Sequence, residues 1–404
     1  MRRTPLIFVV GLALMTARDT TQAQKSKDEP RRPRLDASAD TNDSHVYYEY
    51  GLEKLERDPE EAADAFYWAA RIDPTSADAF YARRCALLLS DKYRFQKYFE
   101  EDRRTLQSNE IKRIDSLYFY SLTINPFLYR KLDVRLFAEY IQLWSEEYAR
   151  RNNLNPGEVR FAVEREISQE SSASMRAWQA YGEGRFREAL DLYAEAIKRA
   201  RHKAELRADR GRLFFQLGQA DSALAELTLA IDELRKTDKK DLVYVYESKA
   251  LIEHSIGLVQ QRLGHAPAAK EAFSQALQED LSYFPAHLQL AFIGMNDKDT
   301  TTTLSELDLA VQIRPDDPLL HYTYGFALAT YGKFEDAQVQ LRKAIEVDPS
   351  FAAPYYLLGE VLDALGKPSE GLTQYQTFLA RASRQDLRRK EAEQRVAIAA
   401  KNGL

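Results

Sequence analysis

The sequence predicts an all-α fold, an α-solenoid of stacked helical hairpins, because several residue types recur at one fixed spacing. Large apolar residues recur every 34 positions in the second half of the chain, at Phe273, Leu307, Leu341 and Tyr375. Small residues and prolines keep the same spacing, at Ala276, Ala310 and Ala344 and at Pro315 and Pro349. A repeat of this length is one helical hairpin, which buries its apolar face only by stacking on its neighbours.

The composition is that of a folded helical protein with no polyanionic or polycationic partner. Hydrophobic residues make up 45% and charged residues 29% of the 404 residues, as in ordinary soluble domains. The chain has only 16 Gly and 14 Pro, which argues against a protein of sheets and tight turns. Its net charge of -5 lacks the basic excess that nucleic-acid binding requires, so we expect no nucleic-acid partner.

Residues 1–23 are predicted to be a signal peptide. Two arginines precede a short apolar run at residues 6–15, and small residues follow at Thr21 and Ala23, where a signal peptidase reads them. Gln24 would then begin the mature chain. An apolar run of this length is too short for a bilayer, which takes about 20 residues, so no integral membrane span is expected after cleavage.

The expected location is the periplasm or the secreted space of a bacterium. Cys85 is the only cysteine, so the chain has no internal disulfide, and its apolar neighbours predict a buried thiol. Residues 24–43 follow the predicted signal peptide. They are polar, contain two prolines and show no periodicity, and they are predicted to be a disordered linker.

The clearest hairpin runs from about residue 318 to residue 350. Its first helix carries Tyr324 and Gly325, its turn carries Gly332, and its second helix carries Leu341 and ends before Pro349. This pattern resembles the tetratricopeptide repeat, in which small residues let two helices approach and proline ends the second helix. The resemblance implies a right-handed superhelix. Six such repeats are expected over residues 171–383.

The N-terminal part of the chain shows the same pattern less completely. Residues 44–106 are predicted to hold one repeat and part of a second, because Gly51, Phe66 and Pro74 match the repeat positions. In the partial repeat, the second helix, expected at 92–106, lacks the small residues of the pattern.

Residues 107–170 are predicted to be helical but atypical. Asn155 is suited to cap a helix that begins at Pro156. Aromatic residues are dense in this segment, at Tyr118, Phe119, Tyr120, Phe127, Tyr129, Phe137, Tyr140, Trp144 and Tyr148. They are interpreted either as bulky residues that pack degenerate repeats or as the lining of a pocket for a small molecule or glycan.

Residues 384–404 are predicted to be a capping helix, because the last repeat would otherwise expose an apolar face. Four apolar residues are expected to face inward, namely Leu387, Ala392, Val396 and Ile398.

No catalytic, metal-binding or cofactor-binding motif is present, so the chain is not predicted to be an enzyme. It contains no His-Glu-x-x-His, no glycine-rich phosphate loop and no Gly-x-Ser-x-Gly. His287 and His321 lie 34 residues apart at the same repeat position, and they are therefore interpreted as packing residues.

The resemblance implies that the first helix of each repeat lines a concave groove. Matched residue by residue, the groove positions are Trp178, Tyr181, Arg212, Phe215, Gln216, Gln261, Arg262, Tyr322, Phe326, Tyr356 and Glu360. Aromatic, guanidinium and amide side chains together suit an extended peptide. The expected function is a non-catalytic scaffold that binds a peptide or partner protein in this groove. The alternative is a small-molecule or glycan site in residues 107–170, with the repeats as a frame. The oligomeric state is left open.

Overall fold

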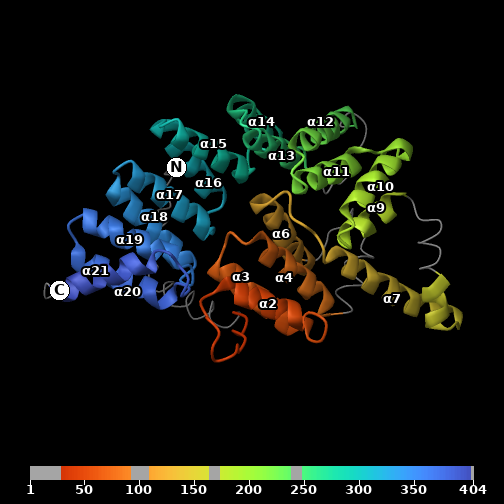
Figure 1. Cartoon of the computed structure of the whole chain (residues 1–404), viewed down its shortest axis with the longest axis horizontal. Helices are drawn as coiled ribbons and strands as arrows, with labels where there is room; N and C mark the ends of the chain where they lie inside the picture. Colours follow the sequence, from red (N-terminus) through yellow and green to blue (C-terminus); the bar gives the residue numbers. More distant parts are fainter. Residues whose placement is uncertain (1–28, 92–108, 163–172, 238–247, 402–404) are drawn as a thin grey trace, which may run out of the picture.

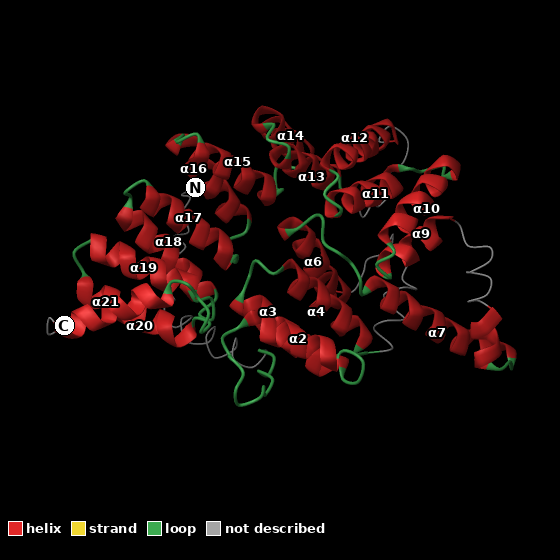
Figure 2. Ribbon diagram, viewed as in Figure 1, coloured by secondary structure: helices red, strands yellow, loops and turns green. Residues whose placement is uncertain are grey.

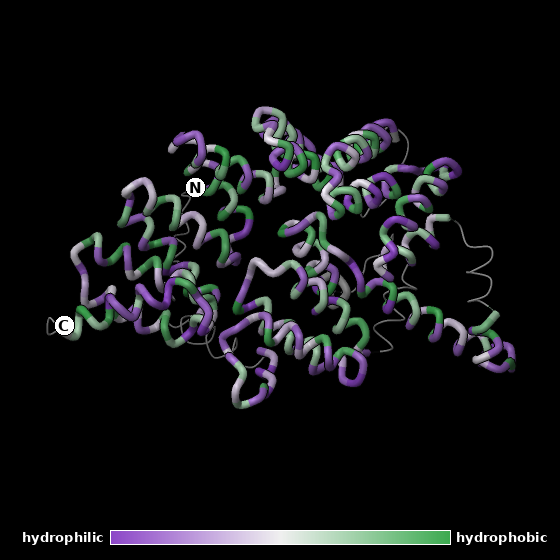
Figure 3. Tube along the Cα trace, viewed as in Figure 1, coloured by the Kyte–Doolittle hydropathy of each residue, from purple (hydrophilic) through white to green (hydrophobic). Residues whose placement is uncertain are grey.

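The computed structural model describes residues 29–91, 109–162, 173–237 and 248–401, and within these ranges it contains helices and no strands (Figure 2). The predicted all-α solenoid is therefore confirmed. Apolar and polar residues alternate along the helices, as expected when one face of each is buried (Figure 3). The predicted signal peptide and the helix expected at 92–106 lie outside the described residues.

In the described residues from 173 onward, six helical hairpins follow one another, and Figure 1 shows them along an arc. The pairs are α9 (Ala173–Gly182) with α10 (Phe186–Arg199), α11 (Ala204–Gln216) with α12 (Ala220–Thr237), α13 (Lys249–Arg262) with α14 (Ala266–Glu279), α15 (Phe284–Asn296) with α16 (Thr300–Ile313), α17 (Pro318–Thr330) with α18 (Phe334–Val347), and α19 (Ala353–Ala364) with α20 (Pro368–Arg381). The two helices of each pair contact each other, and the second helix contacts the first helix of the next pair. This is the arrangement that the 34-residue spacing predicts.

The turns inside these hairpins need a left-handed backbone conformation. Glycine supplies it in five of them, with φ between 71° and 80° at Gly184, Gly218, Gly264, Gly332 and Gly366. The α15–α16 turn uses Lys298 at the same repeat position, with φ 58°. Its polar sequence therefore bends as the others do, and Asp299 caps α16 by accepting a hydrogen bond from the Thr302 amide at 3.0 Å.

The close approach of the two helices in a hairpin requires a small residue in the first helix. A Cβ added to Gly257 would lie 2.4 Å from the Phe273 ring, and one added to Gly359 would lie 2.7 Å from the Tyr375 ring. Both rings are fully buried. The large residue of the second helix thus fills the space that glycine leaves.

The N-terminal part of the chain forms a separate group of helices. Its members are α2 (Ser44–Lys54), α3 (Pro59–Ile72), α4 (Ala77–Leu89), α6 (Asn109–Ile124) and α7 (Asp133–Asn152). The α2–α3 pair repeats the packing rule, since Gly51 lies against the Phe66 ring. Helix α4 contacts α3 on one side and α6 on the other.

This N-terminal group does not simply extend the row of hairpins. Figure 1 shows α6 on the inner side of the arc, close to α13. One buried apolar cluster joins Tyr81 of α4 and Tyr118 of α6 to Leu251 of α13 and Phe273 of α14. The arc therefore packs around its own N-terminal helices.

Residues 29–43 differ from the predicted disordered linker. They are irregular, but Arg32 donates a hydrogen bond to the Tyr47 hydroxyl at 2.8 Å and lies 4.8 Å from the Trp68 ring. Asn42 donates to the Ala380 carbonyl at 3.0 Å. Arg32 and Asn42 therefore hold this segment against the first helices and against α20. Neither residue belongs to a periodic pattern, so the sequence did not predict these contacts.

Helix α21 (Arg389–Lys401) covers the last hairpin, as a capping helix should. Ala392 is buried among Tyr356, Tyr375 and Phe378, with Val396 beside it. The expected inward orientation of Leu387 and Ile398 is wrong, since their exposed fractions are 95% and 57%. Leu387 precedes the helix and so does not share its buried face.

Replacing Gly257 with valine should separate α13 from α14. The added side chain would collide with the Phe273 ring, and overpacking of this kind typically costs about 1–3 kcal/mol. We expect the free energy of unfolding, measured by urea denaturation, to fall by about 2 kcal/mol or more. Glu271→Val on the exposed face of α14 is the control and should change it by less than about 0.5 kcal/mol. Equal stability of the two variants would contradict the packing rule.

Candidate partner-binding face

The inner face of the first two repeats is filled by the chain itself. Residues 125–132 join α6 to α7 without forming a helix, and they lie against α9 and α11. The Phe127 ring stacks on the Phe215 ring, with centroids 3.8 Å apart and an interplanar angle of 22°. The Phe127 carbonyl accepts a hydrogen bond from Gln216 Nε2 at 2.7 Å. The neighbouring residues Phe215 and Gln216 thus contact both the side chain and the backbone oxygen of Phe127.

The next two residues of this segment make a second set of contacts. The Leu128 carbonyl accepts a hydrogen bond from the Tyr181 hydroxyl at 3.3 Å. The Tyr129 ring meets the Tyr181 ring edge to face, with centroids 5.2 Å apart. The Tyr129 hydroxyl donates to the Gly182 carbonyl at 2.9 Å, which anchors the segment at the end of α9.

Arg130 completes the set with a charge pair. Its Nη2 lies 2.7 Å from Asp209 Oδ1, and its Nη1 donates to the Tyr118 hydroxyl at 2.8 Å. Asp209 also pairs with Arg212, at 3.2 Å. Because these groups are largely withdrawn from water, removing one partner would leave the other as a buried unpaired charge.

Five of the predicted groove residues therefore face the chain's own residues rather than open space. Tyr181, Phe215 and Gln216 contact the 125–132 segment directly, and Arg212 reaches it through Asp209. Trp178 meets the Phe137 ring of α7 edge to face, with centroids 5.3 Å apart. The sequence could not show this, because the contacting residues lie far apart along the chain and follow no repeat.

The last predicted groove positions are covered by the C-terminal cap. Tyr356 is only 7% exposed, packs against Phe378, and has the Arg388 guanidinium 5.9 Å from its ring. Burial raises the pKa of Glu360, and the hydrogen bond from Tyr356 opposes that rise. Tyr322 is partly buried and meets the Phe351 ring edge to face.

The middle of the arc remains open. Gln261 and Arg262 of α13 are exposed, and Gln261 Nε2 lies 3.5 Å from Gln289 Oε1 of α15. Phe326 of α17 is 44% exposed and Phe292 of α15 is 38% exposed. Phe292 was not among the predicted groove residues, although it precedes Phe326 by one repeat length of 34 residues. The repeat spacing could have identified it.

Most aromatic residues of the atypical segment pack internally. Tyr118 is buried, and Tyr120 meets the Phe80 ring with centroids 4.7 Å apart. The main exception is on α7, which extends away from the arc in Figure 1. There Trp144 and Tyr148 are exposed and stack on each other, with centroids 5.1 Å apart.

His287 and His321 serve as packing and hydrogen-bonding residues. His287 Nδ1 lies 2.6 Å from Glu306 Oε2, and His321 Nδ1 lies 2.8 Å from Gln340 Oε1 at the same position one repeat later. Among the described residues, no group of three or more His, Cys, Asp or Glu side chains is arranged to hold a metal ion. Cys85 is buried, and burial raises the pKa of its thiol to about 12.

Two tetratricopeptide-repeat family models match the chain, at residues 180–240 and 327–386. In these two stretches the chain is similar to the tetratricopeptide repeat. The first covers most of the filled part of the inner face, and the second covers the end of the arc before α21. A search of curated proteins gave no match.

Several solved structures are similar to the chain. One is YrrB, described as a tetratricopeptide-repeat protein with an unusual peptide-binding site, at 20% identity over 52% of this chain and 97% of that protein, with a TM-score of 0.39. Another is the C-terminal part of a repeat protein from Cytophaga hutchinsonii, at 15% identity over 51% of this chain and 77% of that one, with a TM-score of 0.43. A third is MamA from Desulfovibrio magneticus, at 18% identity over 45% and 97%, with a TM-score of 0.38.

In the ranges that the structure describes, no helix combines the length and the apolar character needed to cross a bilayer.

The His287–Glu306 pair should make stability depend on pH. Burial alone lowers the pKa of His287, but the hydrogen bonds to Glu306 and to the Leu281 carbonyl outweigh it, so the pKa lies above its ordinary value of 6.5. The pair's contribution is fully present below the pKa of the unfolded state and is lost as pH rises through the folded-state pKa. Glu306→Gln should therefore remove a loss of stability that the wild type shows above about pH 6.5.

Urea denaturation at a series of pH values measures this effect. Glu335→Gln is the matched control, because it removes an exposed glutamate of α18, for which the structure shows no histidine partner. It should keep the wild-type pH profile. Identical profiles for Glu306→Gln and the wild type would show that the pair does not titrate as described.

Proposed function

We propose that the chain is an exported, non-catalytic scaffold that binds an extended peptide or a partner protein on the open middle part of its inner face. The observation that carries this proposal is the pair of exposed phenyl rings, Phe292 and Phe326, at one repeat position of neighbouring hairpins. The tetratricopeptide repeats support the general class, since stacked hairpins offer a continuous surface for holding another chain.

The chemistry of this open surface suits a polypeptide. Exposed phenyl rings offer apolar area into which side chains of a partner can pack. The amides of Gln261 and Gln289 are on the same run of first helices and can bond to backbone groups of an extended segment. Arg262, which is exposed, adds one positive charge that favours a carboxylate on the partner.

A small-molecule or glycan site in the aromatic segment is the weaker alternative. Of that set, Trp144 and Tyr148 are exposed and close enough to act together, and they present a flat stacked pair on a projecting helix. Small-molecule sites are usually concave and enclose most of the ligand. A protein partner therefore agrees better with the geometry.

Export to the periplasm or the secreted space is part of the proposal. It rests on the basic, apolar and small-residue order of the first residues of the chain, which is typical of a signal peptide.

Truncating the two phenyl rings should release the partner. We expect Phe292→Ala/Phe326→Ala to weaken binding of proteins that co-purify from the native host by at least about tenfold, because central aromatic residues often contribute about 2 kcal/mol each. The control is Leu309→Ala/Val339→Ala, which removes exposed apolar side chains from the second helices α16 and α18. Quantitative mass spectrometry of the three pull-downs measures the effect. Equal recovery of every partner by both variants would refute the proposed surface.

Export predicts a defined mature N-terminus. The protein isolated from the envelope or medium of its host should begin at Gln24, as measured by N-terminal sequencing or intact-mass analysis. Replacing Ala23 with a bulky residue such as tyrosine should block this cleavage, because the peptidase accepts only small side chains there. Lys25→Gln, which lies beyond the cleavage site, is the control and should be processed normally. Recovery of the uncleaved chain in the cytoplasm would refute export.

A further inference from the structure

We propose that the 125–132 segment is an internal ligand of a peptide-binding site on α9 and α11, and that this site also binds a partner segment of the order aromatic, apolar, aromatic, arginine. This site is separate from the open surface around Phe292 and Phe326, and the proposal goes beyond that function. The evidence is the way in which the segment is held.

The site bonds to the backbone of the segment, as a peptide-binding site must. Gln216 and Tyr181, on successive first helices, donate to the carbonyls of two consecutive residues, Phe127 and Leu128. Residues 128–130 belong to no helix or turn. Bonds to consecutive carbonyls do not depend on the side chains of the ligand, so another chain could form them equally well.

The site also contacts three side chains of the segment. Phe215 stacks on Phe127, and the Tyr181 ring lies edge to face with Tyr129. Asp209 pairs with Arg130. Two aromatic surfaces and one carboxylate define the chemistry of the partner: two aromatic side chains separated by one residue, followed at once by arginine.

One polar atom of the site has unused capacity. Gln216 Oε1 is buried, and it accepts no hydrogen bond within the described part of the chain, although Gln216 Nε2 donates to Phe127. A buried acceptor without a donor is unfavourable. A partner segment with a backbone amide or a hydroxyl at this point would satisfy an atom that the internal segment leaves unpaired.

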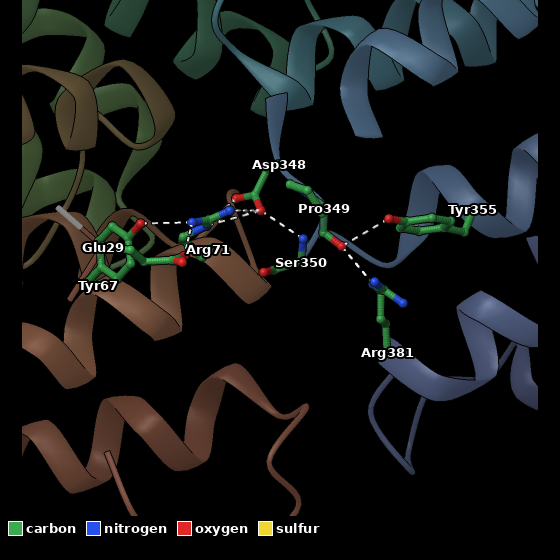
Figure 4. Close-up of polar contacts among 8 residues, drawn as sticks. All are labelled: Glu29, Tyr67, Arg71, Asp348, Pro349, Ser350, Tyr355 and Arg381. Atoms are coloured by element: carbon green, nitrogen blue, oxygen red, sulfur yellow. Dashed lines mark hydrogen bonds and ion pairs between the residues drawn. The ribbon is translucent and has the colours of Figure 1, made fainter. Parts of the chain in front are cut away.

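Two polar contacts that help to hold the N-terminal helices on the arc lie elsewhere, in addition to the apolar cluster around Tyr81 and Tyr118. Figure 4 shows Arg71 of α3 paired with Asp348, with Arg71 Nη2 2.7 Å from Asp348 Oδ1 and Nε 2.9 Å from Oδ2. Tyr120 of α6 donates to Asp317 at 2.7 Å. These two contacts join α3 and α6 to the far hairpins, so their removal weakens the attachment of the N-terminal helices without changing a residue of the site.

Fluorescence anisotropy with a labelled peptide of residues 124–132 tests the proposal. The wild-type chain should bind it weakly, because the tethered segment competes at an effective concentration of about millimolar. Phe127→Ala/Arg130→Ala empties the site and should bind the peptide about 10- to 100-fold more tightly. Adding Phe215→Ala and Asp209→Asn to that variant should abolish binding, and a peptide with alanine at positions 127, 129 and 130 should not bind.

A second variant decides the matter if Phe127→Ala/Arg130→Ala fails to fold, as judged by circular dichroism. Arg71→Ala/Tyr120→Phe keeps the site and the internal segment but removes the two distant polar contacts with Asp348 and Asp317. It should bind the peptide more tightly than the wild type, with faster hydrogen exchange in residues 125–132. In contrast, Phe292→Ala/Phe326→Ala should leave peptide binding unchanged, which separates this site from the open surface.

Three results would overturn the proposal. The first is no peptide binding by any folded variant. The second is equal binding by the wild type and the emptied variant, which would mean that the segment does not fill the site. The third is dimerisation of the loosened variant, seen by light scattering, without peptide binding, which would make a second copy of this chain the occupant.

Discussion

The close approach of two helices at a small residue is the constraint on which the rest of the structure depends. Where Gly257 and Gly359 lie against Phe273 and Tyr375, no other side chain has room, and the ring of the second helix fills the space that is left. The two helices of each hairpin therefore lie close together, and the hairpins stack one on the next and curve into an arc. The arc has an inner side, and the contacts that do not follow the repeat are concentrated on it.

The inner side is divided into three parts by what covers it. The 125–132 segment fills the beginning, α21 and the residues before it cover the end, and the middle stays open around Phe292 and Phe326. The two covered parts differ in chemistry. The cap is mainly apolar packing, in which Ala392 lies among aromatic rings. The filled part combines buried apolar side chains, Phe127 and Leu128, with hydrogen bonds to backbone carbonyls and an Arg130–Asp209 pair. The hydrogen bonds to backbone carbonyls and the ion pair can form equally well with another chain, and therefore the first part is the one suited to exchange.

The hairpins could be predicted from the sequence, while the contacts across the arc could not. The residue types at Gly332 and Leu341 recur because the same packing is needed at these positions in every hairpin. A requirement that recurs in each hairpin produces a periodic pattern in the sequence. The contact between Phe127 and Phe215 occurs only once, and a single contact between residues far apart in the chain produces no periodic pattern. Even within the repeats the prediction was incomplete: Phe292 occupies the register of Phe326 and was missed, while Tyr181 was assigned to an open groove that the chain itself fills.

The residue that precedes proline at the end of a hairpin shows how the two kinds of position combine. Arg314 and Asp348 are 34 residues apart, each followed by the proline that ends the repeat. Asp348 also accepts a hydrogen bond from the Ser350 amide at 2.9 Å, but Arg314 occupies the same position without a carboxylate, so the charge at this position can differ between repeats. Arg314 lies 5.1 Å from the Tyr120 ring of α6, and Asp348 pairs with Arg71 of α3. Opposite charges at one repeat position thus hold two different helices of the N-terminal group. The repeat places these residues at regular intervals along the arc. The side chains at positions that hairpin packing does not fix then determine which N-terminal helix packs against each hairpin.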